Sequence, residues 1–294
     1  MKRKFQGALY LSTAAAIWGG MYVASKYTLA VVPPFTLLLI RYAVGAAIMV
    51  ALCRLRGIAV LASKSRSLLF QIGFIGYFVS IAAQFIGTKL SSAHMGAVIT
   101  SLSPLFQSAF AVILLRAGMS VRQLTAAIFS FAGVMIITGT SDNQNEGIWS
   151  AGNLFLLAAA ATWGYYSILV KRISASEPAL QTTAGGILIS TLFCLPFALF
   201  ELPDWQFAVL SNPCILSSIL YLSVLSTVVA YFCWNKGLAM TDPHQAGIFF
   251  FLQPIVGSLL GWLLLDETLS MAFIAGSLMI LASVYFVMRD AVKG

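Results

Sequence analysis

The chain has 294 residues, of which 60% are hydrophobic and 9% are charged, whereas a typical soluble domain has about 25% charged residues. This composition excludes a water-soluble globular fold, because such a fold needs a polar exterior. The net charge of +8 does not indicate nucleic-acid binding, because the basic residues are dispersed between apolar segments instead of forming one continuous face. The sequence therefore predicts an integral membrane protein surrounded by lipid.

The apolar segments are each about 20 residues long, the length at which an α-helix crosses about 30 Å of hydrocarbon. They are too long and continuous for barrel strands, and a helix pairs its own backbone groups in lipid. The first segment follows Lys2, Arg3 and Lys4 and is longer than the apolar core of a signal peptide, so we expect it to remain uncleaved. In chain order, ten transmembrane helices are predicted at 7–25, 34–53, 68–88, 91–115, 122–139, 151–171, 181–200, 215–236, 245–264 and 270–288.

The distribution of basic residues predicts the orientation. An even number of spans places both termini on one side, and most of the 17 basic residues then fall on the side of the termini. Lys26 and Lys89 fall on the other side. Because a Lys/Arg excess marks cytoplasmic loops, we expect both termini to be cytoplasmic and the protein to lie in the cell inner (cytoplasmic) membrane.

The two halves of the chain resemble each other. Each half would contain five spans, and this odd number inserts the second copy upside down, an arrangement that recurs in secondary transporters with a substrate site near the midplane. We therefore predict two inverted five-helix repeats, 1–140 and 150–294. At an offset of 145, Gly7, Trp18, Gly19, Lys26 and Pro33 match Gly152, Trp163, Gly164, Lys171 and Pro178, and at an offset of 150, Gly87, His94, Leu102, Pro104 and Ser120 match Gly237, His244, Leu252, Pro254 and Ser270.

Short motifs in these spans resemble those of the drug/metabolite transporter superfamily, and of its EamA-type members in particular. They are Ala16-Ile17-Trp18-Gly19, Ala161-Thr162-Trp163-Gly164, Leu39-Ile40-Arg41-Tyr42, Leu102-Ser103-Pro104, Leu252-Gln253-Pro254 and Leu265-Asp266-Glu267-Thr268-Leu269. The resemblance extends over essentially the whole chain. It implies a ten-helix fold with a central cavity lined mainly by spans 1, 3, 4, 6, 8 and 9. Arg116-Ala117-Gly118 departs from the pattern, because it lacks the acidic residue that Glu267 supplies in the second repeat.

Aromatic and polar side chains on the spans that the resemblance places around the cavity are candidate substrate ligands. Aromatic faces bind apolar groups and cations, and amides within apolar spans need partners. The alternative role of each aromatic residue is packing or anchoring at the membrane interface, and that of each amide is a hydrogen bond between helices. The candidate substrate-binding residues are Trp18, Tyr22, Gln84, Trp163, Tyr166, Tyr231, Asn235 and Gln253.

Pro104 and Pro254 lie near the middle of the fourth span of each repeat. Proline removes an i→i−4 hydrogen bond, so the carbonyls of Thr100 and Phe250 lose a donor. These sites are either hinges or cavity-facing backbone, or they are permanent kinks satisfied by neighbouring helices. Both prolines are candidate conformational residues.

Arg41 is a basic residue well inside a span, and an intramembrane charge is by default a functional candidate. It either meets a substrate carboxylate or ties helices together through backbone carbonyls, and its place on the second span favours the tie. Gly257 and Gly261 form a GxxxG pair, which indicates close packing within the chain or in a homodimer. His94 and His244, which begin the fourth helices, are polar helix ends or groups that titrate near neutral pH.

The sequence lacks the signatures of catalysis. It contains no nucleotide-binding loop, metal-ligand cluster or catalytic dyad, and Cys53, Cys194, Cys214 and Cys233 form no ligand pattern. We expect no enzymatic activity, no cofactor and no metal. A carboxylate at mid-depth in a span, which proton coupling commonly uses, is also missing.

The hypothesis that these features favour is a secondary transporter. It would move small amphipathic metabolites, such as amino acids, by export or exchange through alternating access. The alternatives are a channel or passive scaffold, and a carrier for organic cations or drugs held by an aromatic box. The expected partners are a small-molecule substrate and the lipid bilayer, without nucleic acid.

Overall fold

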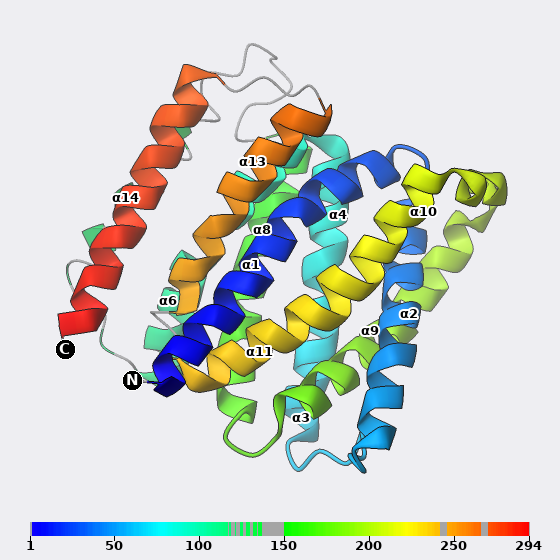
Figure 1. The fold of residues 1–294 in the computed structure, drawn as a ribbon, viewed down its shortest axis with the longest axis horizontal. Helices are drawn as coiled ribbons and strands as arrows, with labels where there is room; N and C mark the ends of the chain where they lie inside the picture. The colour runs from blue at the N-terminus through cyan, green and yellow to red at the C-terminus, as the bar shows by residue number, and fades with distance from the viewer. Residues whose placement is uncertain are drawn as a thin grey trace.

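The computed structural model describes residues 2–116, 150–241, 246–265 and 270–293, together with isolated positions between 118 and 136. Every regular element among these residues is a helix (Figure 1). The elements of the first half are α1 (Lys2–Leu29), α2 (Pro34–Leu55), α3 (Arg66–Gln71), η1 (Ile72–Val79), α4 (Ser80–Leu90), α5 (Ala93–Thr100) and α6 (Ser103–Leu115). Those of the second half are α8 (Ala151–Ile173), α9 (Ala179–Glu201), η3 (Leu202–Asp204), η4 (Phe207–Ser211), α10 (Pro213–Leu220), η5 (Tyr221–Val229), α11 (Ala230–Met240), η6 (Gly247–Phe251), α13 (Leu252–Leu265) and α14 (Met271–Lys293).

Six helical segments of the described chain are long and apolar enough to cross a membrane, and two shorter apolar helices, Phe249–Leu264 and Met271–Ser283, follow them. The six are Pro34–Leu55, Arg66–Leu90, Met95–Leu115, Ala151–Ile173, Ala179–Glu201 and Pro213–Met240. Every predicted span except 122–139 overlaps at least one described helix, and 122–139 lies largely outside the described residues. Both ends of the chain lie at the same end of the helix bundle (Figure 1). Large apolar side chains such as Phe200 and Leu192 are exposed, as expected for a surface that faces lipid.

The helices of one half pack in the same pattern as those of the other. α1 packs against α11 and α13, and α8 packs against α4 and α6. These contacts are related by the two sequence offsets, because α8 follows α1 by 145 residues and α11 follows α4 by 150. α2 and α9, the second helices of the two halves, pack against each other. The first helix of each half therefore packs against the third and fourth spans of the other half.

Two glycine pairs allow the closest of these helix crossings. A Cβ atom at Gly237 would lie 3.2 Å from the carbonyl oxygen of Gly7, and a Cβ atom at Gly87 would lie 2.8 Å from that of Gly152. Gly7 corresponds to Gly152, and Gly87 to Gly237, at the offsets identified in the sequence. The repeated glycines therefore mark the equivalent crossings of α1 with α11 and of α8 with α4.

The third span of each half contains a π-helical segment, η1 in one and η5 in the other. π-Helical geometry is rare and occurs mostly as single turns, frequently at functional sites. The two segments occupy equivalent positions, directly before α4 and α11. They set the rotation of α4 and α11 about their axes, and hence the side chains that these helices direct inward.

The fourth span of each half is interrupted where the prolines lie. α5 ends at Thr100 and α6 begins at Ser103, so that Pro104 occupies the first turn of a new helix. In the second half, the 3₁₀ segment η6 leads into α13, whose first turn contains Pro254. The Ser103 hydroxyl donates to the carbonyl of Thr100 at 2.6 Å, which supplies a donor that the break removes. The side chain of Pro254 lies outside the described residues.

Candidate central binding site

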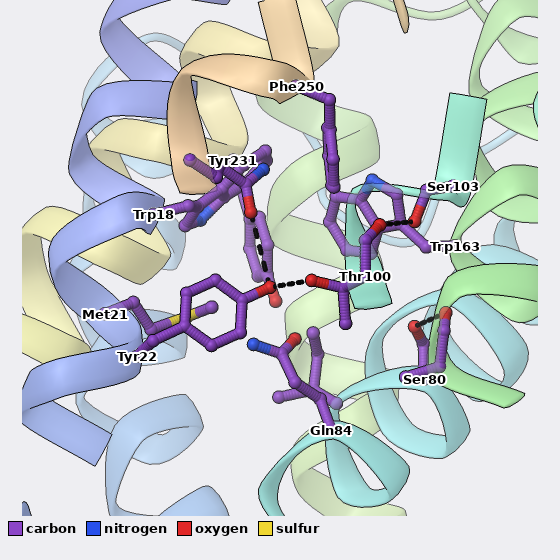
Figure 2. Close-up of a pocket in the computed structure, with 13 residues that line it drawn as sticks. Trp18, Met21, Tyr22, Ser80, Gln84, Thr100, Ser103, Trp163, Tyr231 and Phe250 are labelled. Carbon is purple, nitrogen blue, oxygen red and sulfur yellow. Dashed lines mark hydrogen bonds between the residues drawn. The ribbon is translucent and has the colours of Figure 1, made fainter. Parts of the chain in front are cut away.

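A cavity lies between α1, α11 and α13 on one side and α4, α6 and α8 on the other (Figure 2). Its volume is about 20 Å³, which is room for about one water molecule. The lining comes from the six spans from which the family resemblance implied a cavity. The lining residues are Trp18, Met21, Tyr22, Ser80, Ile81, Gln84, Thr100, Ser103, Ala159, Trp163, Tyr231, Phe250 and Gln253.

Four aromatic rings form the upper wall in Figure 2. The ring centroids of Trp18 and Trp163 are 5.1 Å apart, with an angle of 87° between the ring planes. These residues occupy equivalent positions in the two halves, so the halves meet at this edge-to-face pair. Tyr231 lies 5.5 Å from Trp18, and Phe250 lies 5.9 Å from Trp163. We call these four rings the aromatic cage, because ring faces of this kind bind apolar groups and cations.

Tyr22 links three helices at the opposite side of the cavity (Figure 2). Its hydroxyl is hydrogen-bonded to the Thr100 hydroxyl and donates to Gln253 Oε1 at 3.3 Å. The ring fits because Gly96 has no side chain: a Cβ atom there would lie 2.9 Å from the Tyr22 ring. Tyr22 therefore connects α1 with α5 and α13 at the cavity wall.

Three buried nitrogen atoms in the cavity lining have no hydrogen-bond partner among the described residues: Gln84 Nε2, Trp163 Nε1 and Gln253 Nε2. Leaving a buried donor unpaired costs about 1–3 kcal/mol. The indole nitrogen of Trp163 is a donor in any side-chain orientation, whereas Trp18 Nε1 donates to the carbonyl of Ser226 at 2.9 Å. The cavity thus presents N–H groups suited to an acceptor on a bound molecule.

Tyr166 and Asn235, two predicted ligands, lie outside the cavity lining. The Tyr166 hydroxyl donates to Asn235 Oδ1 at 2.5 Å, and Asn235 Nδ2 donates to the Tyr77 hydroxyl at 3.0 Å and to Thr183 Oγ1 at 2.8 Å. Tyr77 and Tyr166 also share a hydrogen bond of 3.1 Å. These groups form a paired network beside the cavity, and a ligand would reach them only after the network rearranges.

Arg41 is fully buried next to the cavity. Its Nε donates to Thr227 Oγ1 at 2.5 Å, and one terminal nitrogen donates to Ser226 Oγ at 3.2 Å and to the Ser226 carbonyl at 3.4 Å. The same nitrogen lies 3.5 Å from the Tyr231 hydroxyl, and the other lies 3.3 Å from the Met21 sulfur. These contacts tie α2 to η5, as one alternative predicted, and they place the charge behind two cavity residues.

The remaining candidates are placed as follows. Gly257 packs within the chain: a Cβ atom there would lie 3.0 Å from Ala97 Cβ and 3.2 Å from the Gly19 carbonyl oxygen. His244 and Glu267, and the side chain of His94, lie outside the described residues. Among the described residues, the cysteines are free and no group of three or more His, Cys, Asp or Glu side chains could hold a metal ion.

Several apolar cavity residues were missed from the sequence, in particular Met21, Ile81 and Ala159, and Phe250 was identified only through its carbonyl. Residues of these types are so common in the spans that nothing distinguishes a lining position from a packing position. Thr100 was identified only through its carbonyl, yet its hydroxyl faces the cavity (Figure 2).

Comparison with known proteins agrees with this fold. The sequence model of the EamA-like transporter family matches residues 5–139 and 150–289. An uncharacterized transporter of Bacillus subtilis, YetK, is 24% identical over 97% of this chain and 87% of its own. An uncharacterized transporter of Archaeoglobus fulgidus is 24% identical over 94% of this chain and 95% of its own. A solved crystal structure with 21% identity covers 98% of both chains with a TM-score of 0.76, which shows the same fold.

An all-helical membrane fold and a family match in both halves define the class: the chain is a multi-pass membrane transporter of the drug/metabolite transporter superfamily. Within that class it belongs to the EamA-like transporter family. The prediction of the family from sequence motifs is therefore confirmed.

Proposed function

We propose that the chain is a secondary carrier that moves small amphipathic metabolites, amino acids or related compounds, across the cytoplasmic membrane by alternating access. In this proposal ten spans form two inverted five-helix repeats, 1–140 and 150–294, with both termini in the cytoplasm. The observation that supports it most is the small cavity between two groups of helices, α1, α11 and α13 on one side and α4, α6 and α8 on the other. Loading such a cavity requires the groups to separate.

A pair of lysines supports alternating closure at the two ends. Lys26 of α1 donates to the carbonyls of Thr88 at 3.1 Å and Ser91, at the end of α4. Its equivalent, Lys171 of α8, donates to the carbonyls of Leu238 at 3.1 Å and Thr241 at 2.7 Å, at the end of α11. Each lysine crosses from one helix group to the other. With the termini in the cytoplasm, Lys26 closes the external end and Lys171 the cytoplasmic end.

The lining supports an amphipathic substrate. The aromatic cage suits an apolar group, and the N–H groups of Gln84, Trp163 and Gln253 can donate to a polar group with a lone pair. The same cage favours a second candidate, a carrier for organic cations or drugs, because ring faces attract cations by about 0.5–2 kcal/mol. A channel is a weaker alternative, because a cavity that holds about one water molecule offers no continuous path.

Counterflow in proteoliposomes tests the proposal. The purified full-length chain is reconstituted, and uptake of a panel of radiolabelled amino acids, carboxylates and amines is measured with and without the same unlabelled compound inside. A carrier gives saturable uptake that internal substrate stimulates, and Trp163→Ala should weaken its apparent affinity. Arg54→Gln is a matched control because Arg54 is exposed at the end of α2. Uptake that rises linearly with concentration and ignores internal substrate would contradict a carrier.

A further inference from the structure

We infer that Arg41 makes the central cavity select a solute that bears a carboxylate over a solute of the same shape that bears an ammonium group. The inference rests on the proposed function for the identity of the site, but it concerns binding and can fail separately. It divides the two candidate substrate classes that the aromatic cage alone leaves open.

The positive charge of Arg41 has no counter-charge among the described residues. Among the described residues, the buried charged side chains are Arg41 and Glu177. Glu177 lies between α8 and α9, where it accepts from the Ser63 hydroxyl at 3.0 Å and the Lys64 backbone at 2.7 Å. Arg41 contacts only neutral groups. The core around the cavity therefore carries a positive charge that no described carboxylate offsets.

One terminal nitrogen of the Arg41 guanidinium has only a weak hydrogen-bond partner. This nitrogen carries two N–H donors, and its hydrogen-bond contact is the sulfur of Met21 at 3.3 Å. A thioether is a weak acceptor. Because methionine is flexible, a bound carboxylate could displace the Met21 side chain from this edge. Burial of a charge with weak partners is costly, and an incoming carboxylate would lower that cost.

The charge of Arg41 lies directly behind two residues of the cavity lining. Met21 and Tyr231 both line the cavity and both contact Arg41. Figure 2 shows Met21, Tyr231, Gln84 and Trp163 around the same cavity. The unpartnered nitrogens of Gln84, Trp163 and Gln253 are donors as well. A carboxylate is attracted by the Arg41 charge and can accept from these N–H groups, whereas an ammonium group is repelled by that charge.

The Arg41 guanidinium disfavours a second cation at the aromatic cage. The Arg41 guanidinium already lies over the rings of Tyr42, Phe85 and Tyr231, 5.6 Å from each centroid. Tyr231 is one of the cage rings. A second cation on that ring would share it with Arg41 at short range, and like charges in a low-dielectric site repel strongly.

The test uses three probes of one skeleton: phenylpropanoate, phenylpropanamide and phenylpropylammonium. Their binding to the full-length chain in lipid nanodiscs is followed by tryptophan fluorescence at neutral pH, with empty nanodiscs as the blank. We expect the acid to bind about tenfold more tightly than the amine, with the amide between them. In Arg41→Gln this preference should vanish. Arg54→Gln, on the exposed end of the same helix, should retain it.

Several outcomes would overturn the inference. They are equal or tighter binding of the amine by the unmodified protein, an acid preference that persists in Arg41→Gln, and no binding of any probe at millimolar concentration. If Arg41→Gln does not fold, Arg41→Lys replaces it: the retained charge should keep the acid preference, and its loss would contradict the inference. Counterflow fails independently of this binding assay, so loss of the carrier function and loss of the charge preference are distinguishable.

Discussion

Replacing Lys26 should increase the fraction of molecules that are open to the outside. Lys26 donates to the carbonyls of Thr88 at 3.1 Å and Lys89 at 3.2 Å, and to that of Ser91. These bonds are partly exposed, so we assign about 1 kcal/mol to the whole contact, below the about 1.5–3 kcal/mol of a buried charged hydrogen bond. Lys26→Met keeps the length of the apolar stem and removes the ammonium donor. A change of about 1 kcal/mol corresponds to about a fivefold increase in the population open to the outside.

The assay uses a single cysteine in the cavity. Ala159→Cys, in a background without the native cysteines, places a thiol in the lining without removing a side-chain hydrogen bond. A membrane-impermeant thiol reagent then reports access from each side. Lys26→Met should raise external labelling about fivefold, and Lys171→Met should raise labelling from the cytoplasmic side. Lys89→Met is the control, because this neighbouring lysine is exposed.

The reasoning is refuted if neither lysine variant changes labelling, or if both raise it on the same side. If Lys26→Met instead raised labelling from the cytoplasmic side, and Lys171→Met from the outside, the lysines would still close the two ends. The predicted orientation in the membrane would then be wrong.

Three further predictions concern the site and the scaffold. Trp163→Ala and Gln253→Ala should each weaken apparent substrate affinity in counterflow, and wild-type affinity in both would show that the cavity is not the site. Tyr166→Phe should leave that affinity unchanged and lower thermal stability by about 1–2 kcal/mol, because Asn235 loses a buried donor; a change confined to affinity would place Tyr166 in the site. Gly87→Ala should destabilise the protein by about 1–3 kcal/mol, since its Cβ atom would lie 2.8 Å from a backbone oxygen. The control is Gly118→Ala, where nothing lies within 4 Å, and equal destabilisation of both variants would contradict the close crossing.

Much of the helical scaffold could be predicted from the sequence, because apolar length is a strong signal in a membrane. The repeated Gly7 and Gly87 positions and the repeated lysines also have clear structural counterparts. The breaks in the fourth spans are located by their prolines, although the two-residue separation between α5 and α6 is not evident from the sequence.

The position of each side chain along its helix axis, relative to the cavity, could not be predicted from the sequence. Tyr166 follows the cavity residue Trp163 by three positions, and Asn235 follows Tyr231 by four. Each pair lies on one helix face, but the second member lies a turn beyond the cavity. Periodicity predicts the helix face on which a residue lies, but it does not predict whether that residue is level with the cavity. The π-helical segments η1 and η5 add to this difficulty, because no pattern in their apolar sequences distinguishes π from α geometry.

The central claim, that the two ends open in alternation, is tested most directly by distances between spin labels at both ends of the same molecules. Tyr27→Cys with Leu90→Cys reports the end that Lys26 closes, and Arg172→Cys with Thr241→Cys reports the end that Lys171 closes, each pair in a background without native cysteines. The account predicts a short and a long distance for each pair, with addition of a transported substrate shifting the two populations in opposite directions. One fixed distance at both ends, or long distances at both ends together, would contradict alternating access.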